Sequence, residues 1–178
     1  MGFRRDLLEA LLPLAALGTS SASVPPEHPR AIFVLRNNDI GDLLVITPLF
    51  EALKRRFPDA TITAGIGDWN RPVLEHNPWV SHIAPVNGPW HNKFAGHSEA
   101  AALRYVFGSP EVAALRSAHF DIGIDVLGSQ WGALLMSRAG ISYRMGVRGY
   151  AGGHSLANAT VPFRADEHVG RMALRFAE

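Results

Sequence analysis

The chain has 178 residues, with 17 basic and 16 acidic side chains and no cysteine. This length suits one domain with a sizeable core, and 47% hydrophobic with 19% charged residues is a globular composition. A net charge of +1 gives no sign of nucleic-acid binding. The lack of cysteine excludes disulfides and thiolate metal sites and fits a reducing compartment.

Residues 1–29 are predicted to form an extension followed by a linker. Apolar residues cluster within positions 3–14, around and behind Arg4 and Arg5. Three interpretations stay open: an amphipathic helix on a membrane surface or on the domain itself, a poorly ordered extension, or a signal peptide. The run is too short to span a bilayer. Residues 24–29 (VPPEHP) contain three prolines, which are typical of a linker.

The rest of the chain alternates β-rich runs with helical patterns. Ala31–Leu35 is a continuous apolar run, as expected of a strand buried on both faces. Residues 42–57 have the apolar spacing of a helix, and Pro48 predicts a kink or break in its first turns. Further strands are predicted at 61–66, 82–86, 120–127, 143–147 and 157–161, and further helices at 72–76, 99–107, 111–118, 129–139 and 166–176. This alternation predicts a Rossmann-like α/β domain of three layers with a mostly parallel sheet.

The loop after the first predicted strand, residues 36–42 (RNNDIGD), is the first candidate site. Ligands of open α/β sheets bind beyond the carboxyl ends of the strands. Gly41 allows a tight turn or close backbone approach, and Asp42 is expected to face the crevice. By spacing alone the simpler alternative is favoured, namely that Asp39 or Asp42 caps the helix. The loop is neither a Walker loop nor a dinucleotide-binding glycine turn.

Residues 33–49 (FVLRNNDIGDLLVITPL) resemble the opening signature of family 9 glycosyltransferases. The resemblance continues at 57–63, 70–78, 120–126, 143–147 and 167–168 and so covers about residues 31 to 178. It implies the N-terminal half of a GT-B architecture. Residues 30–165 are then the acceptor-binding domain, and residues 166–178 are the start of an interdomain helix, with the donor-binding domain absent.

The resemblance also implies a function. Family members similar to heptosyltransferases transfer a sugar from a nucleotide-sugar such as ADP-heptose to a lipid-linked, cell-envelope saccharide. Asp42 matches their catalytic base, in an inverting reaction without metal or other cofactor. The family works in the cytoplasm at the inner membrane, so peripheral membrane contact is compatible with it. Without a donor-binding half, we expect no transfer by this chain alone; the alternative function is a non-catalytic α/β binding module that retains the acceptor fold.

The expected acceptor-binding residues are Asn38, Gly41, Arg71, Arg144, Arg148 and His168. The three arginines are predicted in loops or at strand ends that can face an anionic acceptor, with solvated surface arginine as the alternative. His168 belongs to a Glu-His pair that matches the family, and a packing role fits it equally well. The histidine spacing predicts no metal site.

Tryptophan supplies a further set of candidates. Trp69, Trp79 and Trp90 are predicted in loops, where a sugar could stack on them, although packing under loops is the commoner use. Trp131 is predicted to belong to a helix core.

Overall fold

The computed structural model describes residues 16, 18–19, 21–90 and 98–178. The apolar stretch at positions 3–14, with its three interpretations, lies outside the described residues. None of the helices in the described ranges has the length and apolar character needed to cross a bilayer.

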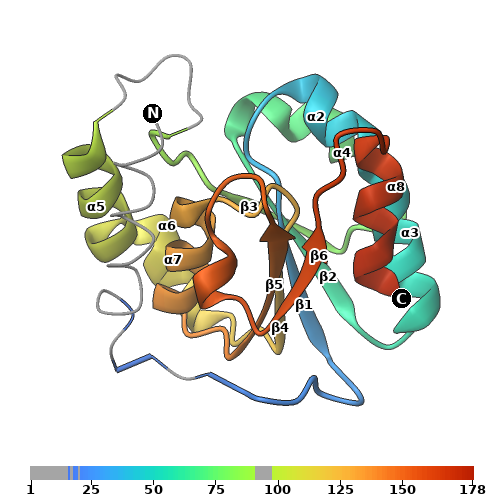
Figure 1. The fold of residues 1–178 in the computed structure, drawn as a ribbon, viewed down its shortest axis with the longest axis horizontal. Helices are drawn as coiled ribbons and strands as arrows, with labels where there is room; N and C mark the ends of the chain where they lie inside the picture. The colour runs from blue at the N-terminus through green and yellow to red at the C-terminus, as the bar shows by residue number, and fades with distance from the viewer. Residues whose placement is uncertain (1–15, 17, 20, 91–97) are drawn as a thin grey trace.

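Six parallel strands form one sheet in the order β3-β2-β1-β4-β5-β6 (Figure 1). Their bounds are β1 Ala31–Leu35, β2 Thr61–Ile66, β3 His82–Pro85, β4 Ile122–Asp125, β5 Tyr143–Arg148 and β6 Ala159–Pro162. β1 lies in the middle of the sheet, and four of its five residues are buried. The predicted α/β fold with a parallel sheet is confirmed.

Helices cover both faces of the sheet (Figure 1). One face carries α2 Ile40–Val45, α3 Thr47–Arg56, α4 Arg71–Leu74 and α8 Val169–Leu174, and the other carries α5 Glu99–Gly108, α6 Pro110–Ser117 and α7 Gln130–Arg138. Short 3-10 turns are η1 Asp68–Asn70, η2 His154–Leu156 and η3 Arg175–Ala177. The result is the predicted three-layer arrangement.

The helix predicted at 42–57 is divided in two. α2 ends at Val45 and α3 begins at Thr47, with Ile46 between them in a non-helical conformation (φ −99°, ψ 1°). Pro48 occupies the first turn of α3, where its missing N–H costs no hydrogen bond. The predicted break at Pro48 is confirmed.

Each face of the sheet has its own apolar core. Leu49, Phe50 and Leu53 of α3 pack with Met172 and Phe176 in one cluster. α8 and η3 thus belong to the helical layer of this domain. Whether they also lead into a second domain remains a prediction.

The core on the opposite face of the sheet contains Phe33, whose ring requires a glycine at position 65 in the neighbouring strand β2. A Cβ atom at Gly65 would lie 2.3 Å from the ring of Phe33, so only glycine leaves room for that ring. Phe33 also packs on Phe120, with ring centroids 5.1 Å apart.

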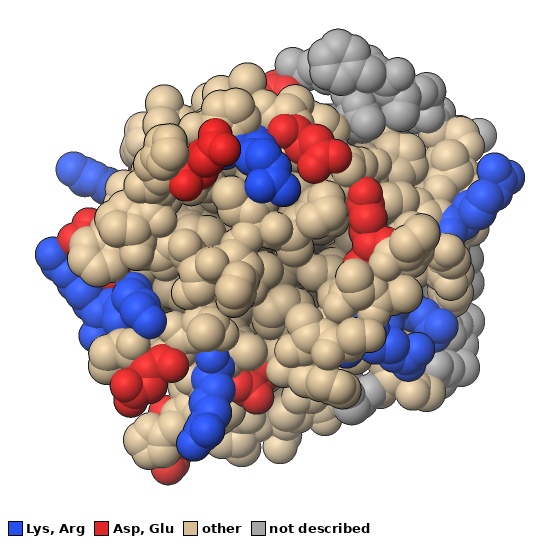
Figure 2. All heavy atoms as spheres, turned by 180° about the vertical axis from the view of Figure 1, so that it is seen from behind, with Lys and Arg blue, Asp and Glu red and all other residues tan. Residues whose placement is uncertain are grey.

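Positive and negative side chains are interspersed on the rear face of the molecule (Figure 2). The described atoms of this face show no continuous basic patch. This distribution agrees with the near-neutral net charge of +1.

Candidate active site

The strand order places a topological switch point at the middle of the sheet. The chain runs outward from β1 through β2 to β3, then returns to place β4 on the other side of β1. The loops that follow β1 and β4 therefore diverge at the carboxyl edge, where open α/β sheets bind their ligands.

Asp42 lies at this edge, in the first turn of α2, and its side chain is 40% exposed. Arg36 Nη2 lies 3.3 Å from its Oδ1, and Asn38 Nδ2 donates a hydrogen bond of 2.5 Å to its Oδ2. Asp39 is the N-cap residue but makes no side-chain capping bond. The partners thus orient the Asp42 carboxylate, while its exposure leaves lone pairs for a ligand.

The loop that carries Asp42 is anchored to the segment after β2. Trp69 Nε1 and Asn70 Nδ2 each donate a hydrogen bond of 2.9 Å to the backbone carbonyl of Asn38. Asn37 Nδ2 donates to the carbonyl of Val86, at 3.3 Å. These contacts hold the loop from outside its own segment, so the position of Asp42 is preorganised.

Two buried charged residues at the switch point were not predicted as site residues. Arg36 is 5% exposed and Asp125, at the end of β4, is 2% exposed. Burial lowers the pKa of the Arg36 guanidinium, and the nearby carboxylates of Asp42 and Asp125 oppose that effect. In the sequence, Asp125 is one of two acidic residues within the predicted strand 120–127, and Arg36 directly follows the predicted strand 31–35.

Asp125 organises the loop that follows β4. Its carboxylate accepts N–H hydrogen bonds from Leu127 (3.0 Å) and Ser129 (2.8 Å). Burial nevertheless raises the pKa of Asp125 to about 6, against the opposing influence of backbone N–H groups and of Arg36. The close approach of α7 requires glycine at position 132, where a Cβ atom would lie 2.2 Å from Asp125 Oδ2.

Five of the predicted acceptor-binding residues lie at the carboxyl edge of the sheet. Asn38 and Gly41 belong to the loop and helix after β1, Arg71 starts α4, Arg148 ends β5, and His168 precedes α8. Gly41 does not have a positive φ, and a Cβ atom there would meet nothing within 4 Å. The tight turn expected of Gly41 is therefore not observed, and the close approach of its backbone to a ligand stays a prediction.

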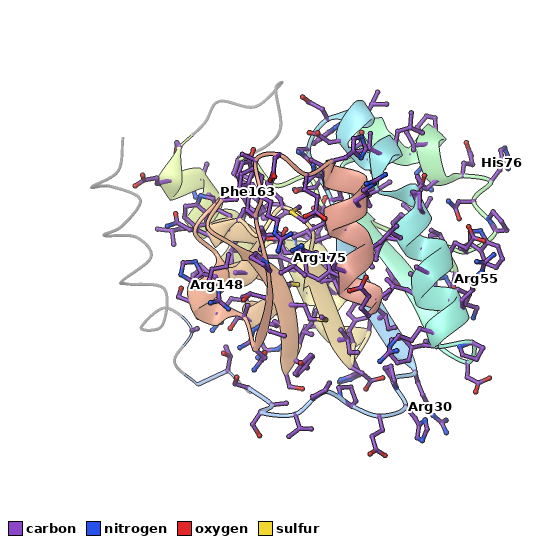
Figure 3. All side chains as sticks on the ribbon, turned by 45° about the vertical axis from the view of Figure 1, so that its right-hand side comes forward. Arg30, Arg55, His76, Arg148, Phe163 and Arg175 are labelled. Carbon is purple, nitrogen blue, oxygen red and sulfur yellow. The ribbon has the colours of Figure 1, made fainter. Side chains whose placement is uncertain are left out.

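Arg148 and His168 have local partners. The Arg148 guanidinium is exposed and donates to Thr160 Oγ1 on β6, at 2.7 and 3.1 Å, and Figure 3 places it on the opposite side of the sheet from His76 and Arg55. His168 Nδ1 accepts the backbone N–H of Gly170 (3.1 Å) and so caps α8. The start of α8 packs tightly on α2, since a Cβ atom at Gly170 would lie 2.6 Å from the carbonyl oxygen of Val45.

Arg144 does not lie at this edge, which corrects the expectation that it faces an acceptor. It is the second residue of β5, near the amino end of the strand, and is 4% exposed. Its guanidinium donates hydrogen bonds to the carbonyls of Leu156 (2.8 Å) and Ile141 (2.5 Å). These bonds tie β5 to the segments before and after it, which is a structural role.

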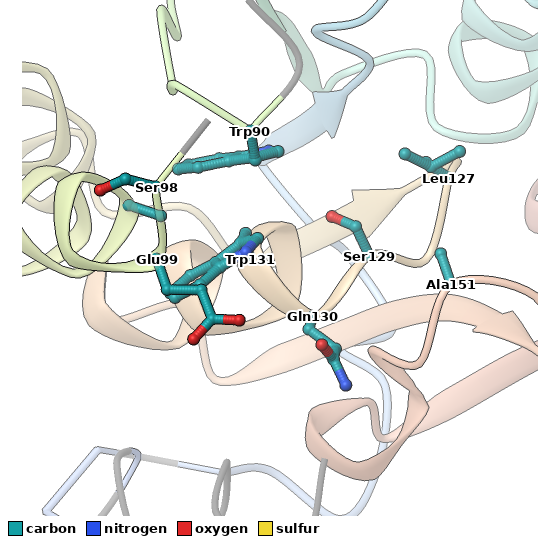
Figure 4. Close-up of a pocket in the computed structure, with 9 residues that line it drawn as sticks. Trp90, Ser98, Glu99, Leu127, Ser129, Gln130, Trp131 and Ala151 are labelled. Carbon is teal, nitrogen blue, oxygen red and sulfur yellow. The ribbon is translucent and has the colours of Figure 1, made fainter. Parts of the chain in front are cut away.

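A cavity of about 440 Å³ opens between α5, α7 and the loop after β5 (Figure 4). The rings of Trp90 and Trp131 form one wall, stacked with centroids 6.1 Å apart and planes 23° apart. Trp131 also packs against the core, so its predicted core role describes only part of its surroundings. Trp69 anchors the Asp42 loop, and Trp79 packs on the core of the α3 face.

The chain was compared with known protein families, sequences and solved structures. A scan of protein-family models found no match, and neither did a search of curated protein sequences. Solved structures do match, and they share the Rossmann-like fold of GT-B glycosyltransferases.

Three of these structures are glycosyltransferases by name. E. coli ADP-heptose LPS heptosyltransferase II matches with a TM-score of 0.67 and 22% identity, over 83% of this chain and 40% of its own. E. coli heptosyltransferase WaaC with ADP matches at 0.64 and 14%, over 83% and 45%. The family 9 glycosyl transferase of Veillonella parvula DSM 2008 matches at 0.66 and 16%, over 86% and 42%. The predicted resemblance is confirmed for the fold, and the chain spans less than half the length of each of these proteins.

Proposed function

We propose that this chain is the N-terminal, acceptor-binding domain of a heptosyltransferase-like glycosyltransferase. The observation that carries the proposal is Asp42, a partly exposed carboxylate held at the switch point by Arg36 and Asn38. The structural neighbours include a heptosyltransferase with ADP and with ADP-2-deoxy-2-fluoro heptose. A nucleotide-sugar of this kind is therefore the proposed donor, bound by a second domain.

The proposed chemistry is an inverting displacement. An acceptor hydroxyl attacks the anomeric carbon of the donor while Asp42 takes its proton. A new carbon–oxygen bond forms as the bond to the diphosphate breaks, and the nucleoside diphosphate leaves with the electron pair. Because Asp42 is positioned before any ligand arrives, little reorganisation is needed at this step.

The acceptor is proposed to be a lipid-linked cell-envelope saccharide at the cytoplasmic face of the inner membrane. Arg71, Arg148 and His168 are the described candidates at this edge for its anionic groups, with Asn38 and Gly41 nearer to Asp42. Arg144 is left out, because its guanidinium is buried among carbonyl groups.

The test is an Asp42→Asn substitution in the chain joined to a donor-binding domain, with ADP release from ADP-heptose as the assay. Asn nearly preserves the volume of Asp and can still contact Arg36, but it cannot take a proton. We expect turnover to fall by about 100-fold or more with unchanged folding.

Asp39→Asn is the matched control, since Asp39 lies three residues earlier and makes no side-chain cap. It should retain turnover near that of the unsubstituted protein. An active, folded Asp42→Asn protein would contradict the assignment of Asp42 as the base. No ADP release by the unsubstituted protein joined to a donor-binding domain would favour the alternative, a non-catalytic binding module.

A further inference from the structure

The cavity between α5 and α7 takes no part in the chemistry proposed for Asp42. We call it the tryptophan cavity and define it by Trp90, Trp131, Glu99, Gln130, Leu127 and Ser129 (Figure 4). We propose that it binds a neutral sugar ring of the acceptor, with the indole pair as the apolar wall and Glu99 as a partner for hydroxyl groups. The inference rests on the proposed function, because it assigns a second subsite to the same acceptor.

The walls of the tryptophan cavity suit a sugar ring in shape and polarity. A pyranose has a face of C–H groups and a rim of hydroxyls, so it needs a flat apolar surface beside polar groups. The indoles of Trp90 and Trp131, which both line the cavity, provide the surface, and the exposed side chain of Glu99 provides a polar group. The volume of about 440 Å³ lies within the range of small-molecule sites.

The aromatic wall is held in place before any ligand arrives. Trp90 packs edge-to-face on Tyr105, with ring centroids 5.4 Å apart, and the Tyr105 hydroxyl donates to the Glu111 carboxylate. Trp131 is fixed by α7 and by packing on the core. A preorganised wall lowers the entropy cost of binding.

Charge selects a neutral ligand over a phosphorylated one. None of the described residues that line the tryptophan cavity is Lys or Arg, and Glu99 is exposed in it. A carboxylate repels phosphate but accepts hydrogen bonds from hydroxyl groups. Cations at the carboxyl edge, such as Arg71 and Arg148, lie outside this lining, so anionic and neutral parts of an acceptor would bind in different places.

The tryptophan cavity and Asp42 share one edge of the sheet. Leu127 and Ser129 of the cavity wall follow β4, the strand next to β1. Asp125 accepts the backbone N–H of Ser129 and lies close enough to Arg36 to act on its charge, while Arg36 contacts Asp42. The proposed sugar subsite and the proposed base are therefore linked through Asp125 and Arg36 at the same edge of the sheet.

The test uses the four tryptophan indole N–H signals in ¹H–¹⁵N NMR spectra of the chain. The probes are methyl β-glucoside and methyl α-mannoside, with glucose 6-phosphate and AMP for comparison. We expect the glycosides to shift the Trp90 and Trp131 signals saturably, with little change at Trp79 and weaker effects from glucose 6-phosphate. No saturable shift up to about 100 mM glycoside, or a response to AMP alone, would overturn the inference.

Substitutions decide whether the shifts report the proposed contacts. Trp131→Leu should weaken glycoside binding by at least about tenfold, whereas the matched control Trp79→Leu, a partly buried tryptophan of the other core, should not. If Trp131→Leu does not fold, Glu99→Ala at an exposed helix start should weaken binding several-fold. Unchanged binding in the folded Trp131→Leu or the Glu99→Ala protein would contradict the inference.

The two proposals fail separately. Asp42→Asn should leave glycoside binding unchanged, because Asp42 is not part of the cavity wall. Loss of transfer in Asp42→Asn without any glycoside binding would remove only the sugar subsite. Glycoside binding together with an active Asp42→Asn protein would remove only the catalytic assignment.

Discussion

The raised pKa of the Asp125 carboxyl can be tested through the pH dependence of the unfolding free energy. Its pKa rises from 3.8 to about 6 on folding, because burial disfavours the charged carboxylate. Between these two values the folded protein binds the proton more tightly than the unfolded chain does. The stabilisation from this group is therefore complete below pH 3.8 and is lost as the pH rises through about 6.

The magnitude follows from the size of that interval. A difference of about two pH units, at 1.36 kcal/mol for each, corresponds to about 3 kcal/mol of unfolding free energy. Asp125→Asn removes the titrating group. We expect the free energy of unfolding of the unsubstituted chain, minus that of the variant, to fall by about 3 kcal/mol between about pH 3 and 7.

The assay is urea unfolding of both proteins across this pH range. Ile124→Val, a buried neighbour in β4 without a titrating group, is the control and should shift the curve by a constant amount, about 0.5–1.5 kcal/mol. A difference between the unsubstituted chain and Asp125→Asn that stays constant with pH would refute this account of Asp125.

Three further substitutions test the packing of the domain through unfolding free energies. Gly132→Ala should cost about 1–3 kcal/mol, because its Cβ would lie 2.2 Å from Asp125 Oδ2. Gly41→Ala should instead stabilise by about 0.5–1 kcal/mol, since it is a helical position with nothing within 4 Å. Arg144→Met should lower stability by roughly 1–3 kcal/mol by leaving carbonyls without their donors and should not change glycoside binding. A Gly132→Ala protein as stable as the original, or Arg144→Met with weakened glycoside binding, would contradict these assignments.

The layered fold was predictable because its signals are local. Ala31–Leu35 is apolar throughout, as a strand covered on both faces must be, and the structure buries it at the centre of the sheet. Pro48 marked the break between α2 and α3 for an equally local reason, the missing N–H and fixed φ of proline.

The partners of Asp42 were harder to predict. Arg36 and Asp125 approach each other only because β4 returns to pair with β1 after two intervening strands. Strand order of this kind is set by the packing of the whole domain and cannot be predicted from the hydrophobic periodicity of the sequence. The placement of Asp42 near a helix start could be inferred, but the charged pair behind it could not.

The prediction for Arg144 was wrong for a different reason. Its position at the start of a predicted strand already indicated the amino end of β5, and in a parallel sheet those ends lie opposite the ligand-binding edge. The direction of the strand could therefore be predicted from the sequence, and the charge of Arg144 is no evidence that it lies at the ligand-binding edge. Its burial against two carbonyl groups depends on η2, which the sequence pattern did not reveal.

The anchoring of Asn38 has a consequence for how this chain can vary. Trp69 and Asn70 donate hydrogen bonds to the main-chain oxygen of Asn38, whereas its side-chain amide donates one to Asp42. Every amino acid has that main-chain oxygen, so these two hydrogen bonds can form with any residue type at position 38. A natural or engineered substitution at position 38 can therefore change the hydrogen bonding of the Asp42 carboxylate while the loop that carries Asp42 keeps its anchoring hydrogen bonds.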